Sequence, residues 1–148
     1  MERIFALKIP FYNKTEQIEK ERENYLEFQI PFISKYYGYF IESDSPGKRV
    51  IYLLIEFIDG QTLDKYDQTE LSLLEKVNIV FTVILTINYF HSKEYVYRDL
   101  HMNNIIINKD KEVKLIDLDR LIKINKQQTH DFNFQNVPPE VKFGQFFT

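Results

Sequence analysis

The sequence predicts an α+β domain, in which strands and helices occupy separate stretches of the chain. Three observations support this class: an amphipathic helix precedes two strand-like runs, a turn separates those runs, and a long helix precedes a short hairpin. With 148 residues, 44% of them hydrophobic and 28% charged, the chain is long enough to bury a core. A net charge of -3 gives no electrostatic footprint for nucleic acid.

The first third of the chain is predicted to form strands around one helix. Ile4–Ile9 is expected to be a strand, and Asn13–Gln29 has the periodicity of an amphipathic helix. Ile33–Ile41 and Arg49–Phe57 are strand-like runs, and the turn signal Ser43–Lys48 lies between them. A helix packed on a small sheet is therefore expected here.

The rest of the chain is predicted to begin with a helix from Ser72 to His91. Ser72 and Glu75 have the spacing of a capping box, which marks the helix start. After it, "NIIIN" and "EVKLID" predict a hairpin, and Arg120–Thr148 reads as polar and irregular. A two-lobed split is expected near Phe57–Gly60. One face of the predicted helix is marked by Leu73, Val77, Phe81, Ile84 and Asn88.

Several classes of protein are disfavoured by what the sequence lacks. It contains no Cys, so disulfides and thiolate metal sites are excluded and a reducing compartment is allowed. Met1–Pro10 has no signal-peptide architecture, and the longest apolar run, Ile79–Ile87, is too short to span a membrane. The three histidines, at 91, 101 and 130, are too scattered for a zinc site. A soluble cytoplasmic protein without a membrane partner is expected.

The segment around the predicted hairpin contains the residues that point to chemistry. Asp99 is followed five residues later by Asn104, and thirteen residues further on by Asp117. Carboxylate and amide oxygens suit Mg²⁺, and a further Asp can orient a hydroxyl nucleophile. With a strand pair between Asn104 and Asp117, this spacing resembles the catalytic loop and metal-binding Asp of eukaryotic-type protein kinases. Tyr97-Arg98-Asp99 stands where that family has His-Arg-Asp.

Four other stretches resemble the same family in the same order. Ala6-Leu7-Lys8 is similar to the Ala-x-Lys of the strand that carries the phosphate-binding Lys, and "PFISKYYGYF" resembles the strand entry after helix C. "LLIEFIDGQTL" resembles the hinge strand, and Pro138-Pro139-Glu140 resembles the motif that closes the activation segment. The resemblance covers most of the chain and implies a kinase-like fold: a partial β-rich N-lobe with helix C over residues 1–57, and part of a helical C-lobe over 58–148.

The resemblance also implies a role for each matching residue. Lys8 would position the α- and β-phosphates of ATP, Asp99 would act on the substrate hydroxyl, and Asn104 and Asp117 would hold Mg²⁺. Lys8, Asp99, Asn104 and Asp117 are therefore the candidate catalytic residues. The candidate nucleotide-binding residues are Ala6, Lys8, Glu21, Glu56, Ile58 and Ile106.

Glu21 is favoured over the other glutamates of its helix as the partner of Lys8. In the family, a characteristic spacing separates the glutamate of this helix from the strand entry that here begins at Pro31, and this spacing points to Glu21. At 100° per residue it falls within the apolar stripe of the helix, whereas Glu23 points to about the opposite side. A carboxylate inside an apolar stripe must be paired, because an unpaired buried charge is costly.

Departures from the family pattern bear on activity. All four glycines follow Lys8, so no Gly-rich phosphate loop precedes it, and the C-terminal lobe helices are expected to be missing. The chain is therefore expected to be a fragment with weak or no activity alone. His101 stands where Ser/Thr kinases usually have Lys, and Asp119 replaces a glycine, which costs backbone freedom.

The function expected from the resemblance is transfer of the ATP γ-phosphate to a protein hydroxyl, with Ser/Thr favoured over Tyr. Two alternatives stay open. A pseudokinase or scaffold would bind partners without turnover, and a small-molecule kinase of the aminoglycoside or choline type also has "DLHMNN"-like loops. Arg98 argues against the second alternative, because that family usually has Gly there. Arg98 also allows a phosphate switch at Thr129, although a solvated loop residue without that role is the favoured interpretation of Thr129.

Overall fold

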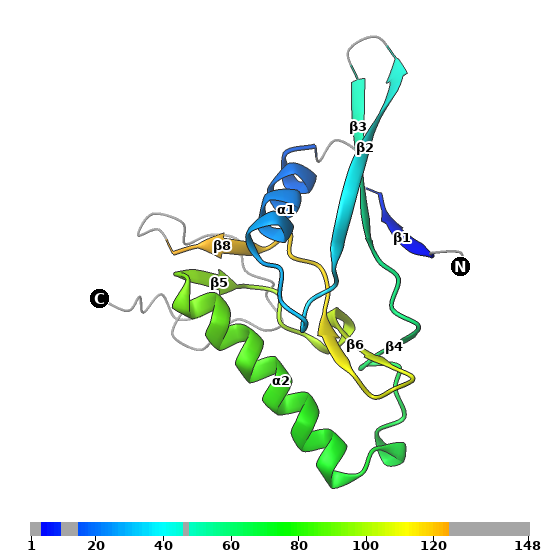
Figure 1. Ribbon diagram of the computed structural model, residues 1–148, viewed down its shortest axis with the longest axis vertical. Coiled ribbons are helices and arrows are strands. Elements are labelled where there is room, and N and C mark those ends of the chain that lie inside the picture. The colour runs from blue at the N-terminus through cyan, green and yellow to red at the C-terminus, as the bar shows by residue number, and fades with distance from the viewer. Residues whose placement is uncertain (1–3, 10–14, 46–47, 125–148) are drawn as a thin grey trace, which may run out of the picture.

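The computed structural model describes residues 4–9, 15–45 and 48–124. These residues form an α+β fold with the helices α1 and α2, eight strands and two short 3-10 helices (Figure 1). The predicted motif Pro138–Glu140 and the predicted switch residue Thr129 lie outside the described residues. The elements are β1 Phe5–Lys8, α1 Thr15–Glu27, β2 Tyr36–Ser45, β3 Lys48–Glu56, β4 Gly60–Thr62, α2 Leu73–Ser92, β5 Tyr95–Tyr97, β6 Ile105–Asn108, β7 Val113–Leu115 and β8 Leu121–Lys123.

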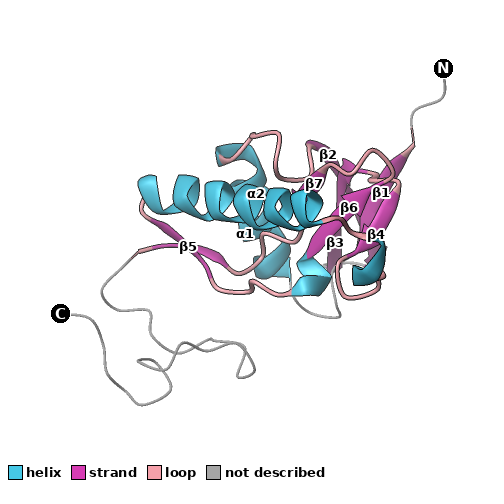
Figure 2. Ribbon diagram, turned by 90° about the horizontal axis from the view of Figure 1, so that it is seen from below, coloured by secondary structure: helices cyan, strands magenta, loops and turns pink. Residues whose placement is uncertain are grey.

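The strands form three small antiparallel sheets. The first has the order β1-β3-β2, the second β4-β6-β7, and the third pairs β5 with β8. The first sheet and α1 precede residue 57, and the second sheet begins at Gly60, although the division into two lobes stays a prediction. Figure 2 shows the strands of both three-stranded sheets toward one end of the molecule and β5 toward the other.

The strands that the sequence predicted are present, and three that it did not predict are formed by long-range pairing. β4, β5 and β8 have only three residues each. Such short segments carry too little alternation to reveal a strand, and their partners lie far away in sequence. The expectation that the chain is irregular from Arg120 onward is wrong for Leu121–Lys123, which pairs with β5.

The buried core joins the first sheet and α1 to the rest of the domain. Phe28 follows α1 and is 1% exposed. Its ring centroid lies 5.0 Å from that of Phe90 and 4.8 Å from that of Tyr95, and both pairs are T-shaped. The segment after α1 then bridges β7 at Ile33 and Leu115. Ser34 N–H donates to the Leu115 carbonyl at 3.0 Å, and Leu115 N–H donates to the Phe32 carbonyl at 2.8 Å. These contacts fix α1 relative to the chain that follows β7.

Helix α2 begins as predicted but exposes the face that the sequence marked. The Ser72–Glu75 capping box is present in full. Leu73 is 79% exposed and Phe81 57%, whereas the inward face carries Ile79, Thr82, Thr86 and Phe90. Thr86 satisfies its hydroxyl by donating to the Thr82 carbonyl at 2.8 Å. Because the helix is apolar nearly all round, periodicity alone could not identify its buried side.

Helix α2 is also longer than its central apolar run. Among the described residues it is the one helix whose length and composition would allow it to cross a membrane, with 20 residues and a mean hydropathy of 1.4. The expectation that no segment spans a membrane was based on Ile79–Ile87, and for the whole helix it stays a prediction. Helices in the core of soluble proteins can have the same length and composition.

Gly60 allows β4 to approach β6 closely. A Cβ at this position would lie 2.2 Å from the Ile107 carbonyl oxygen and 2.7 Å from the Asn108 Cα, and both are backbone atoms that cannot move aside cheaply. A Gly60→Ala substitution is expected to destabilise the protein by about 1–3 kcal/mol, as overpacking typically does. Chemical denaturation measures the effect.

Gly38→Ala is the matched control for this substitution. No atom lies within 4 Å of a Cβ added at Gly38 on β2, so little change in unfolding free energy is expected there. Equal effects of the two substitutions would show that β4 and β6 are not held at this close distance.

Candidate active site

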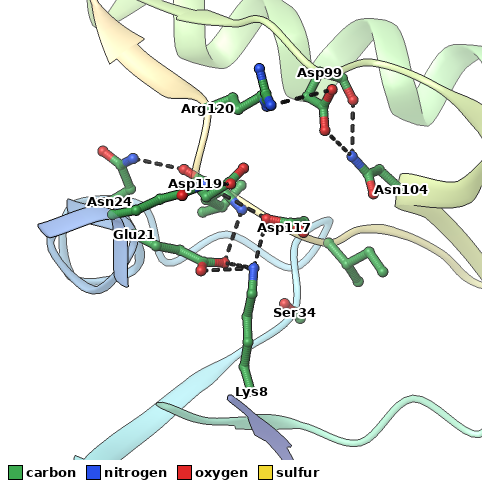
Figure 3. A network of polar contacts seen from close by, with 12 residues as sticks. Lys8, Glu21, Asn24, Ser34, Asp99, Asn104, Asp117, Asp119 and Arg120 are labelled. Atoms are coloured by element: carbon green, nitrogen blue, oxygen red, sulfur yellow. Dashed lines mark hydrogen bonds and ion pairs between the residues drawn. The ribbon is translucent and has the colours of Figure 1, made fainter. Parts of the chain in front are cut away.

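The site is centred on Lys8, whose side chain meets two carboxylates from distant parts of the chain. Lys8 Nζ lies 2.7 Å from Glu21 Oε1 on α1 and 2.7 Å from Asp117 Oδ1, just after β7 (Figure 3). Lys8 is paired with Leu53 in the sheet register, and Leu53 is fully buried, so this face of β1 looks inward. The pairing of Lys8 with Glu21 that the sequence predicted is therefore observed.

Burial dominates the electrostatics of Glu21. Its side chain is 1% exposed, and loss of solvent raises the pKa of its carboxyl from 4.5 to about 7, although the Lys8 charge pulls in the opposite direction. The pKa of Lys8 is raised as well. Burial alone would lower it, but the charges of Glu21 and Asp117 outweigh burial. The ammonium group is thus charged throughout the physiological range.

Asp117 is held in an uncommon backbone conformation. Its φ of 64° is in the left-handed region, which residues other than Gly seldom adopt. Burial would raise the pKa of its carboxyl, but the neighbouring Lys8 charge prevails and lowers it. An ionised carboxylate on a strained turn is a feature of functional sites, where the surrounding structure has to hold the strain.

Asp119 occupies the position where the family pattern has glycine. Among the described residues other than Gly, positive φ values occur only at Glu94, Lys111 and Asp117, so the backbone of Asp119 does not need glycine in this conformation. The expected cost in backbone freedom is therefore not visible as strain here. Burial and the nearby Asp117 charge raise the pKa of the Asp119 carboxyl, and Gln17 on α1 donates a hydrogen bond to it.

Asp99 lies in a second polar cluster with Asn104 and His101. Asn104 Nδ2 donates to Asp99 Oδ2 and to the Asp99 carbonyl, both at 3.0 Å. His101 Nε2 is 3.3 Å from Asp99 Oδ2, and Arg120 Nε is 4.0 Å from Asp99 Oδ1. The spacing of Asp99 and Asn104 pointed to this cluster, whereas Arg120 had no local signal in the sequence.

The two clusters meet at the backbone of Ile116. Its N–H donates to the Asn104 carbonyl at 2.9 Å, and its carbonyl accepts the Tyr97 hydroxyl at 2.9 Å. Tyr97 stands at the position of the family His and is 6% exposed. Asp117 directly follows Ile116. The hydrogen bonds that Asn104 and Tyr97 make to Ile116 therefore also position Asp117, which belongs to the Lys8 cluster.

Asn104 and Asp117 provide a donor set that fits Mg²⁺. The Asn104 amide nitrogen faces Asp99, which leaves the amide oxygen directed elsewhere (Figure 3). Amide and carboxylate oxygens suit this cation, which commonly takes few protein ligands and completes its shell with water and substrate phosphates. No cluster of three or more His, Asp or Glu side chains suited to a metal occurs in the described part of the chain. The metal roles of both residues stay predictions.

The other residues that the sequence predicted to bind nucleotide lie on or next to β1, β3 and β6. Ala6 is paired with Ile55, and Glu56 ends β3. The Glu56 carboxylate is engaged by Lys114 at 2.5 and 2.6 Å, and the Glu56 N–H donates to the Lys35 carbonyl at 2.7 Å. Ile58 lies between β3 and β4 and Ile106 on β6, each partly exposed. Their contacts with adenine stay predictions.

Sequence reasoning missed two polar residues of α1 that contact the site. Gln17 and Asn24 flank Glu21 at spacings of four and three residues, and both bind the segment that follows Asp117. Asn24 is 5% exposed. The position of Asn24 beside the apolar stripe of this helix was a signal in the sequence, but the partners of Asn24 are backbone carbonyls, which no pattern reveals.

Glu21→Gln is expected to change how stability depends on pH. Because the pKa of Glu21 is higher in the folded protein than in the unfolded chain, folding favours the protonated form. The stabilising contribution of Glu21 is therefore greatest below the unfolded pKa and is lost as pH rises through about 7. As pH rises from 4.5 to about 7, the unfolding free energy of the wild type should therefore decrease relative to that of Glu21→Gln.

Denaturation of both proteins across the pH range measures this difference, and Glu23→Gln on the exposed face of α1 is the control. If the difference instead rises with pH, the ion pair with Lys8 stabilises the ionised carboxylate more than burial destabilises it.

Known proteins similar to this chain were found over nearly its whole length. The family model described as protein kinase domain matches residues 1–141. A MAP kinase kinase of Saccharomyces cerevisiae is 33% identical over 128 residues, which cover 78% of this chain and 24% of the relative. An Aurora kinase of Dictyostelium discoideum is 31% identical over 148 residues, covering 93% of this chain and 37% of the relative.

A cAMP-dependent protein kinase catalytic subunit of Mus musculus is 32% identical over 107 residues, covering 70% of this chain and 29% of that protein. The chain thus spans well under half the length of each of these relatives. The family match over residues 1–141, together with the Lys8, Glu21 and Asp117 geometry, shows that the chain belongs to the protein kinase domain family.

Proposed function

We propose that this chain provides the nucleotide-binding and catalytic core of a protein kinase, which transfers the γ-phosphate of ATP to a protein hydroxyl. The observation that carries the proposal is the convergence of Lys8, Glu21 and Asp117, since Lys8 and Asp117 are 109 residues apart in sequence yet lie at 2.7 Å. A lysine held between two carboxylates is placed to exchange one of them for nucleotide phosphates.

Each charged group has a task in this proposal. Lys8, kept in place by Glu21, neutralises the α- and β-phosphates, and Asn104 and Asp117 hold Mg²⁺, which would neutralise charge on the phosphates when bound. Asp99 orients the acceptor hydroxyl and receives its proton. Positioning and charge neutralisation supply most of the rate in such a reaction, so a correctly spaced set of side chains is the main requirement.

The acceptor is proposed to be a Ser or Thr side chain. One relative, 30% identical over 105 residues, is described as a serine/threonine-protein kinase, from Mycolicibacterium smegmatis. His101 lies 3.3 Å from Asp99, where Ser/Thr kinases usually place Lys, so this chain carries an imidazole beside the reacting hydroxyl.

The cytoplasm is the proposed location.

Asp99→Asn tests the proposed base. The substitution keeps the shape of the side chain and removes its ability to accept a proton, so kcat should fall by about 10²–10⁴-fold while nucleotide affinity changes little. Transfer of labelled phosphate from ATP to a general protein substrate measures kcat, and titration with ADP measures affinity. Asp110→Asn, in the exposed β6–β7 turn, is the control.

The same experiment separates the proposal from its alternatives. Undiminished turnover in Asp99→Asn would remove Asp99 from the role of base. Because the chain alone is expected to have weak or no activity, the comparison is made in a longer protein that contains it, and nucleotide binding there without any transfer would indicate a pseudokinase that acts as a binding module. Transfer to a small-molecule hydroxyl with none to protein would indicate the aminoglycoside- or choline-type activity.

A further inference from the structure

One face of α1 binds the segment after Asp117 through three polar side chains. Gln17, Glu21 and Asn24 follow one another at i, i+4 and i+7, so they lie on one side of the helix. Gln17 donates to the Asp119 carboxylate, and Glu21 Oε1 accepts the Leu118 N–H at 3.3 Å. We call these three residues the polar stripe of α1 (Figure 3 labels two of them).

Asn24 makes the most demanding of these contacts. Its amide nitrogen has two hydrogens, and it donates to the Leu118 carbonyl at 2.8 Å and to the Leu121 carbonyl at 2.9 Å. Asn24 is 5% exposed, and Leu118 and Leu121 are fully buried. The Leu121 N–H also donates to the Leu118 carbonyl, at 3.2 Å, so Asn24 bridges the two ends of a tight turn. Without Asn24, this buried turn would lose a hydrogen bond at each end.

This turn directly follows the strained residue Asp117. A positive φ at an Asp persists only where the surroundings hold it. The next residue, Leu118, is held from α1 at both of its polar atoms, because Glu21 binds its N–H and Asn24 binds its carbonyl. The direction of the Asp117 carboxylate therefore depends on α1 through backbone contacts. The contact from Glu21 shares its oxygen with the Lys8 ion pair, whereas the contact from Asn24 is separate from that pair.

We infer that Asn24, assisted by the Gln17–Asp119 contact, is a positioning residue that holds Asp117 in its metal-binding orientation and makes α1 and the turn Leu118–Leu121 move as one unit. The inference rests on the proposed function, because it takes Asp117 to be a ligand of Mg²⁺. Asp119 gains a role here that glycine at this position does not offer, since it supplies the acceptor for Gln17.

Asn24→Leu is the main test, because leucine has a similar size but no donor. Backbone amides at Leu118–Leu121 should exchange hydrogen faster by roughly fivefold for each hydrogen bond lost. ADP affinity in the presence of Mg²⁺ should fall by a similar factor, whereas ADP affinity in EDTA should not change. A role in general stability alone would shift both affinities together. Glu23→Ala, on the opposite side of α1, is the control.

A second set of variants keeps the inference testable if Asn24→Leu does not fold. Asp119→Asn keeps an acceptor for Gln17 and should retain the Mg²⁺-dependent affinity, whereas Asp119→Ala and Gln17→Ala should each lose part of it. The double variant should lose no more than either single one, which is the signature of a direct pair.

Unchanged amide exchange at Leu118–Leu121 in Asn24→Leu would overturn the inference, and so would equal losses of ADP affinity with and without Mg²⁺. If the wild type showed no Mg²⁺-dependent ADP binding, the proposed function and the metal role of Asp117 would both fail. The exchange measurement would then still show whether Asn24 holds the turn.

Discussion

The neutralisation of one buried carboxylate organises this domain. Glu21 is almost completely removed from solvent, and an isolated charge there would be costly. Lys8 from β1 and the Leu118 N–H supply the compensating contacts. These contacts join the first sheet, α1 and the chain after β7, so three separate elements must be in place before the charge is satisfied. The same requirement assembles the candidate active site.

The second half of the site is built on backbone rather than on charge. Ile116 is bonded through its N–H to Asn104 and through its carbonyl to Tyr97, so the loop that carries Asp99 and the turn that carries Asp117 share one residue as a support. The bridge between Ile33 and Leu115 connects this support to the end of α1. Hydrogen-bonded backbone therefore connects the segment after α1 with both clusters.

The sequence was sufficient to identify the residues of the ionic centre, because their order and spacing match a family pattern and because helical geometry separates Glu21 from Glu23. It also located α2, whose capping box is a local signal. It could not orient α2, which is apolar nearly all round, and it could not reveal β8. The partners of Asn24 were equally hidden, since they are backbone carbonyls 94 and 97 residues away. Local patterns identify elements and charged groups, whereas backbone contacts between distant segments require the fold.

The pairing of β1 has a consequence for how Lys8 is held. Within the described residues, β1 is four residues long and pairs with β3 alone, so it is an edge strand with one ladder of hydrogen bonds. Lys8 is its last residue. Its backbone is thus held by the ladder to β3, while its ammonium tip is bound to two carboxylates. The carboxylates therefore give the end of the strand a second hold, and in the proposed function a nucleotide bound at the tip would add to it.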